Sequence, residues 1–209
     1  AVANAFHIMW YQSKERSADR TYFGYPIDQN PADTWLYQEI LVAERPAFVL
    51  QTGVKDGGSI LYFAHLLDLM KAPPEAVVVG VDLILTPTAK TLDHPRIRLV
   101  EGSSTDSATV AAVERLLPAP QGFVSLDSAH ERDHVLRELD LYHRFCAVGR
   151  HLVVEDTDVN GHPVYRNHGP GPYEAVREFL ARHPEFEQDD AWKRDLVSCH
   201  HAGWLRRVG

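Results

Sequence analysis

The sequence predicts a doubly wound α/β domain whose sheet is mostly parallel, preceded by a short N-terminal helical arm. Five short apolar runs, rich in β-branched residues, have the pattern of strands buried on both faces. Amphipathic helical patterns lie between these runs, and such alternation is typical of a parallel sheet covered by helices on both faces. The expected strands span 47–53, 76–82, 97–102, 122–127 and 150–156.

The helices between these strands are predicted from apolar residues that recur at helical spacing. A further helix is expected to begin after Asn30, a suitable N-cap, with Pro31 at its first position. Pro172 is expected to open the last helix. The four apolar stripes comprise Ile60, Phe63, Ala64 and Leu67; Val110, Val113 and Leu117; Val135, Leu139 and Tyr142; and Val176, Phe179 and Leu180.

The two ends of the chain depart from this alternation. Residues 1–30 are less regular and are predicted to form a helical arm or cap, whereas residues 31–209 are predicted to form the main domain. The tail at 196–208 is expected to pair antiparallel with a strand near 186–189. No internal repeat or linker interrupts the main region, so a single domain is expected there.

The composition excludes several classes of protein. With 44% hydrophobic and 24% charged residues, the chain has the composition of an ordinary globular protein, and its net charge of −8 argues against a binder of duplex DNA. No apolar run approaches the roughly 20 residues of a membrane span, and no signal peptide is predicted. Two distant cysteines, Cys146 and Cys199, are expected to be free thiols in a reducing cytoplasm. The oligomeric state stays open, a homo-oligomer included.

Ligands of such sheets bind at the carboxyl ends of the strands, and the first of these ends suggests a nucleotide-like cofactor. It continues into "QTGVKDGGS", where Gly53 permits a tight turn and Gly57 and Gly58 let backbone N–H groups approach a ligand. Asp82 ends the second strand, where a carboxylate can accept both ribose hydroxyls of an adenosine. The motif is neither GxGxxG nor a P-loop, so these residues leave both NAD and S-adenosylmethionine open.

Later strand ends add polar groups to the same edge. "GSSTD" follows the third strand, where an adenine ring could lie, although Asp106 also fits a helix cap. Asp127, Glu155 and Asp156 end neighbouring strands, so their three carboxylates are expected to converge and to repel one another unless a cation joins them. All-oxygen ligation with open positions favours Mg²⁺. Any one of these acids alone could instead cap a helix.

In its motifs the sequence resembles the cephalosporin hydroxylase/rhamnosyl O-methyltransferase family of S-adenosylmethionine-dependent enzymes. The similar segments cover nearly the whole chain from about Thr21 onward: "PADTWLYQEIL", "TGVKDGGS", "GVD", "EGSSTD", "LDSAHERDHVLRELDLY", "VVEDTDVNGHPV" and "GPGPYEAVREFL". The resemblance implies a Rossmann-like fold of the class I methyltransferase type, Mg²⁺ on Asp127, Glu155 and Asp156, and His130 as the catalytic base. It places the cofactor on Gln51, Thr52, Gly53, Ser59, Asp82, Ser103, Ser104 and Asp127.

The chemistry of the residues agrees with this resemblance. A hydroxyl is a poor nucleophile until it loses its proton; a divalent cation lowers its pKa, and a nearby histidine accepts the proton. The sequence therefore predicts a Mg²⁺-dependent O-methyltransferase acting on a hydroxyl of a sugar or another natural-product small molecule. His134, one turn after His130, and His162, on a loop beyond the last parallel strand, are predicted to contact this acceptor, although surface positions also fit both.

Gln51 departs from the family pattern, which usually has an acid at this position. Glutamine retains hydrogen bonds to the cofactor's cationic methionine end but lacks the charge. Two other functions therefore stay open: a hydroxylase-associated component acting on a small molecule, and a non-catalytic cofactor-binding partner. Against the first, the sequence has no redox-cofactor motif and no recognisable triad of two histidines and a carboxylate.

Overall fold

The computed structural model describes residues 2–13, 20–119 and 122–209. Its centre is a seven-stranded sheet with the order β5-β4-β3-β6-β7-β9-β8. The first five of these strands run parallel, and β9 pairs antiparallel with both β7 and β8. The strands are β3 (Phe48–Thr52), β4 (Val77–Asp82), β5 (Ile97–Glu101), β6 (Gly122–Leu126), β7 (His151–Val154), β8 (Phe186–Gln188) and β9 (Trp204–Arg207). The predicted mostly parallel sheet and its antiparallel tail are both confirmed.

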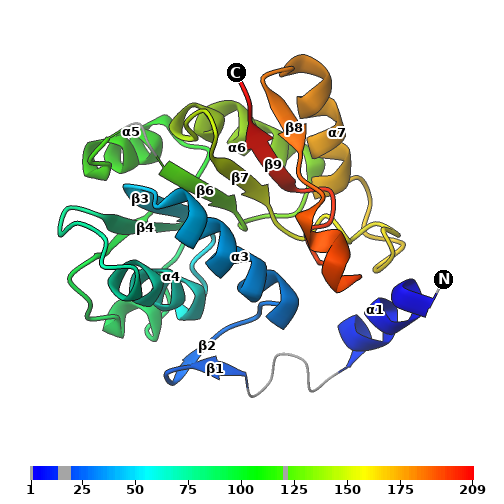
Figure 1. Ribbon diagram of the computed structural model, residues 1–209, viewed down its shortest axis with the longest axis horizontal. Coiled ribbons are helices and arrows are strands. Elements are labelled where there is room, and N and C mark those ends of the chain that lie inside the picture. The colour runs from blue at the N-terminus through cyan, green and yellow to red at the C-terminus, as the bar shows by residue number, and fades with distance from the viewer. Residues whose placement is uncertain (1, 14–19, 120–121) are drawn as a thin grey trace.

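Helices cover both faces of the sheet (Figure 1). One layer contains α3 (Pro31–Glu44) and α4 (Gly58–Leu69), and the other contains α5 (Ser107–Leu116), α6 (Arg132–Tyr142) and α7 (Pro172–Arg182). Short 3₁₀ turns lie at η1 (Ala89–Thr91), η2 (His143–Phe145) and η3 (Ala191–Asp195). None of the helices that the structure describes has the length and apolar character needed to cross a membrane.

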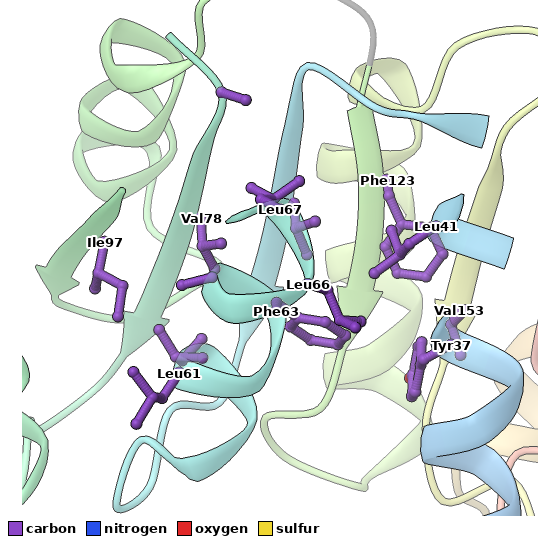
Figure 2. Packing of buried hydrophobic residues seen from close by; sticks show 14 of the residues in the cluster. Tyr37, Leu41, Leu61, Phe63, Leu66, Leu67, Val78, Ile97, Phe123 and Val153 are labelled. Atoms are coloured by element: carbon purple, nitrogen blue, oxygen red, sulfur yellow. The ribbon is translucent and has the colours of Figure 1, made fainter. Parts of the chain in front are cut away.

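Each helical layer packs on its own hydrophobic cluster, because successive residues of a strand point to opposite faces. On β3, Val49 belongs to the cluster under α3 and α4, whereas Phe48 and Leu50 belong to the cluster under the other three helices. Figure 2 shows the first cluster, in which Phe63 of α4 and Tyr37 of α3 lie against the sheet. This double burial explains why the central strands have continuous apolar sequences.

The local signals at the helix starts are also confirmed. Asn30 caps α3 by accepting a hydrogen bond from the backbone N–H of Ala32, and Pro31 occupies the first turn. Pro172 opens α7, where Glu174 accepts a bond from the N–H of Gly171. Asp106 occupies the N-cap position of α5, but its side chain makes no capping bond.

The N-terminal region contains α1 (Val2–Gln12) and a hairpin of β1 (Thr21–Tyr22) and β2 (Tyr25–Pro26). The imidazole of His7 on α1 is buried and lies 2.8 Å from Asp158 in the loop after β7. The α1 helix is thus anchored next to the loop that follows the last parallel strand.

Candidate functional site

A cavity of about 580 Å³ opens at the carboxyl ends of the parallel strands. It brings together most of the residues predicted from the sequence, although they come from the ends of five strands and from the starts of α4 and α6. The predicted residues that line it are Gln51, Gly53, Ser59, Asp82, Ser103, Ser104, Asp127, His130, His134, Glu155 and Asp156. Thr52 and His162 do not line it.

The turn after β3 approaches the end of β6 very closely, which explains its glycine. Gly53 has φ +79°, and a Cβ at this position would lie 1.7 Å from the carbonyl oxygen of Asp127. Thr52 contributes to the same junction, since its carbonyl and hydroxyl oxygens both accept hydrogen bonds from the N–H of Asp127. Thr52 therefore joins two strands behind the cavity, where it is fully buried.

Gln51 holds this turn through its amide nitrogen, which donates to the carbonyl of Gly53 and to the hydroxyl of Ser59. Because a carbonyl can only accept, this contact fixes which end of the amide is nitrogen. The amide oxygen Oε1 is buried and has no hydrogen-bond partner among the described residues. A buried acceptor of this kind fits a cationic donor such as the ammonium of an amino-acid ligand.

The carboxylate of Asp82 already accepts hydrogen bonds from the protein backbone. Its Oδ2 accepts the backbone N–H groups of Val54 and Lys55, at 2.8 and 2.9 Å, and its Oδ1 accepts that of Ile84 at 3.2 Å. A carboxylate has about four acceptor sites, so one site on Oδ1 is left for a ligand. Asp82 thus also supports the turn, and its contact with the ribose hydroxyls of a cofactor stays a prediction.

Asp127, Asp156 and His130 form the centre of the acidic end of the cavity. A ligand atom of each lies within 4.8 Å of the others, and Nε2 of His130 lies 3.1 Å from Oδ2 of Asp156. The strand β7 ends at Val154, two residues earlier than predicted, and Asp156 takes a left-handed conformation with φ 52°. In the part of the chain that the structure describes, no Lys or Arg forms an ion pair with either acid.

The electrostatics of Asp127 also fit a cation. Burial, followed by the nearby carboxylates of Glu155, Asp156 and Asp28, raises the pKa of Asp127 well above its ordinary value. A divalent cation would favour the charged form instead, and carboxylate oxygens are the ligands that Mg²⁺ prefers.

The carboxylate of Glu155, predicted to be a metal ligand, is surrounded by hydrogen-bonding groups of the protein. Its Oε1 accepts hydrogen bonds from the hydroxyls of Tyr37 and Ser125, at 2.7 and 2.6 Å. Its Oε2 accepts one from the amide of Gln29 and lies 3.3 Å from Nε2 of His200. Protein groups thus face all four acceptor sites, so Glu155 can coordinate an ion only by exchanging one of these partners for it.

His134 lies beside the loops that follow β5 and β6. Its Nε2 is 3.2 Å from the hydroxyl of Ser104 and 3.1 Å from that of Ser128. A hydrogen bond to buried Glu138 is the main cause that raises the pKa of His134. His134 therefore joins the loops after β5 and β6, which is a different task from the predicted contact with an acceptor.

His162 lies in a second cavity of about 330 Å³, together with His7, Tyr173 and His201. Its ring stacks on Tyr173 at 3.9 Å, and its Nε2 lies 3.0 Å from Glu174. His162 thus lies outside the main cavity, where it was predicted to contact the acceptor.

Several site residues were not predicted from the sequence. Asp28 and Gln29 precede the cap of α3 and line the main cavity, whereas Tyr37 and His200 support Glu155 from behind it. For Asp28 and Gln29, the only signal in the sequence is the polar run before Asn30. A group of His143, His183 and Glu185 also gathers two histidines and a carboxylate, but none of them lines the main cavity.

Comparison with known proteins identifies the family. A family model described as Rhamnosyl O-methyltransferase/CmcI matches residues 14–208. The rhamnosyl O-methyltransferase of Mycobacterium tuberculosis (strain ATCC 25618 / H37Rv) is 37% identical over 207 residues, which cover 98% of this chain and 81% of the relative.

Solved structures share the fold. An apo structure of CmcI has a TM-score of 0.72 at 21% identity, covering 94% of this chain and 78% of its own. A structure of CmcI with Mg and SAM has a TM-score of 0.70 at 20% identity, covering 91% and 77%. The predicted class I methyltransferase fold is thereby confirmed. Because the family model spans nearly the whole chain, the protein belongs to the rhamnosyl O-methyltransferase/CmcI family.

Proposed function

We propose that the protein is a Mg²⁺-dependent O-methyltransferase that moves a methyl group from S-adenosylmethionine to a hydroxyl of a sugar or a similar natural product. One observation carries this proposal: Asp127, Asp156 and His130 converge in the same cavity that Gln51 and Asp82 line. A cation, a base and a cofactor would thus share one cavity.

The relatives support the reaction class and the acceptor class. Membership of the family makes the chain an S-adenosylmethionine-dependent O-methyltransferase, and the relatives at 37% identity are named rhamnosyl O-methyltransferases. A hydroxylated sugar is therefore the acceptor that we propose, since two adjacent hydroxyls can approach a cation together. CmcI itself has been solved with Mg and SAM, which supports both cofactors here.

The residues divide the work as follows. Gln51, Asp82 and the turn at Gly53 would bind and orient the cofactor, so that its methyl group points at the acidic end. Asp127 and Asp156 would hold Mg²⁺, with Glu155 adding negative charge beside them. The cation lowers the pKa of a hydroxyl that it binds. His130, whose Nε2 lies 3.1 Å from Asp156, would accept the proton of that hydroxyl.

Methyl transfer from labelled S-adenosylmethionine to a panel of rhamnosides and other glycosides tests this function. Label is expected in the acceptor when Mg²⁺ is present and is expected to disappear with EDTA. Cofactor binding without transfer to any acceptor would favour the non-catalytic partner, and transfer that is indifferent to EDTA would remove the metal from the proposal.

Asp82→Ala is expected to weaken S-adenosylhomocysteine binding by about 1–3 kcal/mol, the usual range for hydrogen bonds to a charged group. The loss has two sources, the ribose hydroxyl and the backbone N–H groups of Val54 and Lys55. Calorimetry on Asp82→Asn, which keeps an acceptor for the turn, should give an intermediate affinity. Equal affinity in the wild type and both variants would rule out the ribose contact.

Gln51→Glu is expected to change stability and affinity in opposite directions. The apo protein should lose stability, on the order of 1–3 kcal/mol, because the donor to the Gly53 carbonyl and to Ser59 is lost. Cofactor affinity should rise, because a charged acceptor pairs better with an ammonium. Thermal unfolding and calorimetry measure the two effects separately. Weaker cofactor binding would contradict the proposed contact with the methionine end.

A further inference from the structure

His200 is a buried histidine that touches both acids after β7, although the proposed reaction gives it no task. It lies in the turn before β9, with its N–H bonded to the hydroxyl of Ser198 and its carbonyl bonded to the N–H of Gly203. Its ring packs beside the rings of both Tyr37 and Trp204, at centroid distances of 6.1 and 5.8 Å. The imidazole is therefore held rigidly from behind the cavity.

One nitrogen of this ring supports the backbone of Asp156. The N–H of Asp156 donates to Nδ1 of His200 at 3.0 Å. Asp156 has φ 52°, a left-handed conformation that a residue with a Cβ adopts only when its surroundings stabilise it. The bond from His200 supplies such support, and the same backbone geometry sets the direction of the Asp156 carboxylate toward His130.

The other nitrogen faces Glu155. Because Nδ1 accepts a hydrogen bond, the ring proton is on Nε2. This N–H points to two acceptors, Oε2 of Glu155 at 3.3 Å and the amide oxygen of Gln29 at 3.4 Å. Gln29 in turn donates to the same oxygen of Glu155. His200 and Gln29 thus hold Glu155 together.

Basic side chains are scarce around these acids. Among the described residues, the ion-pair partners of Glu155, Asp156 and buried Asp33 are histidines, namely His130 and His200. Within the described ranges, no Lys or Arg forms an ion pair with any of these three acids.

We propose that His200 is a positioning residue for the metal site: it holds Glu155 and Asp156 in the arrangement that receives the divalent cation. The proposal rests on the metal site under Proposed function. Outer-shell partners of this kind orient metal ligands, and their loss typically costs about 10–100-fold in metal affinity. His200 itself does not line the main cavity, so it acts through the two acids and not on the acceptor.

Titration with Mn²⁺, followed by the EPR signal of the free ion, tests this role without any need for turnover. His200→Ala is expected to raise the Mn²⁺ dissociation constant by about 10–100-fold. His200→Asn can keep an acceptor for the Asp156 N–H, and His200→Gln can keep a donor for Glu155. Both variants are expected to recover part of the affinity, which a loss of bulk packing alone would not predict.

Leu205→Ala is the matched control. Leu205 is fully buried on β9 but belongs to the hydrophobic cluster on the opposite face of the sheet from Tyr37 and Trp204. This variant should lose stability and keep wild-type Mn²⁺ affinity. Wild-type affinity in His200→Ala, or an equal loss in Leu205→Ala, would overturn the positioning role. A wild-type protein that binds no Mn²⁺ would overturn the metal site itself and this role with it.

Discussion

His130→Ala is expected to lower the rate of methyl transfer by about 10²–10⁴-fold, the usual scale for losing a general base. His130 lines the main cavity, and its Nε2 lies 3.1 Å from a carboxylate oxygen of Asp156. An acceptor hydroxyl bound at Asp127 and Asp156 would therefore lie within reach of this nitrogen. Binding of S-adenosylhomocysteine should be nearly unchanged, because the contact of His130 is with Asp156 and not with Gln51 or Asp82.

The pH profile identifies the proton acceptor. The wild-type rate should fall as the pH is lowered, because a protonated imidazole cannot accept a proton, and this limb should be absent from His130→Ala. Protonation of Asp127 can add a second limb through loss of the metal, but higher Mg²⁺ concentrations should move only that limb to lower pH.

His134→Ala serves as the control for His130. It lines the same cavity but bonds to Ser104 and Ser128 on the cofactor side. It should cost less in rate and more in cofactor affinity. Equal losses of rate at both positions, or an unchanged pH profile in His130→Ala, would assign the proton to another group.

Asp127→Asn is expected to abolish tight Mg²⁺ binding and to stabilise the apo protein. The Mg²⁺ dissociation constant should rise by more than the ~10–100-fold that loss of an outer-shell partner costs. Stability should rise because the pKa of Asp127 is raised in the folded protein, so its charged form opposes folding. Each pKa unit relieved is worth about 1.4 kcal/mol, and each kcal/mol about 2–4 °C in Tm at this chain length.

The pH dependence of the stability of the apo protein provides a second check on the role of Asp127. A raised pKa means that the folded state holds this proton more tightly than the unfolded chain. The apo protein should therefore lose stability as the pH rises through the folded pKa of Asp127, and Asp127→Asn should remove that loss. Asp28→Asn removes a charge from the same group and should leave most of the Mg²⁺ affinity. If Asp127→Asn instead destabilised the apo protein, the inference that the charged form of Asp127 opposes folding would be wrong.

The sequence was sufficient to predict the sheet and the position of the acids at its edge. Runs such as 47–53 and 122–127 are apolar because both sheet faces are covered, and parallel neighbours end at one edge. Asp127 and Asp156 could therefore be expected together, and the structure brings them within ion-binding distance. The positions of Asp82 and Gly53 could be predicted for the same reason, because Asp82 ends a parallel strand and Gly53 directly follows one.

The partners of each acid could not be predicted in this way. Glu155 is bonded to Gln29 and Tyr37, which are 126 and 118 residues away in sequence. Such contacts depend on how α3 packs on the sheet, and spacing carries no signal for them. His134 and His162 differ from expectation for a related reason: loop direction after a strand is set by tertiary contacts, here to Ser104 and Tyr173.

The central claim is that the strand-end acids hold a divalent cation beside the cofactor. Its most direct test is anomalous diffraction from crystals grown with millimolar Mn²⁺ and S-adenosylhomocysteine. We expect an anomalous peak bound by Asp127 and Asp156, with the cofactor's ribose at Asp82 and its amino-acid end at Gln51. A cofactor bound there without any peak, with the carboxylates of Asp127 and Asp156 turned away from each other, would contradict the account.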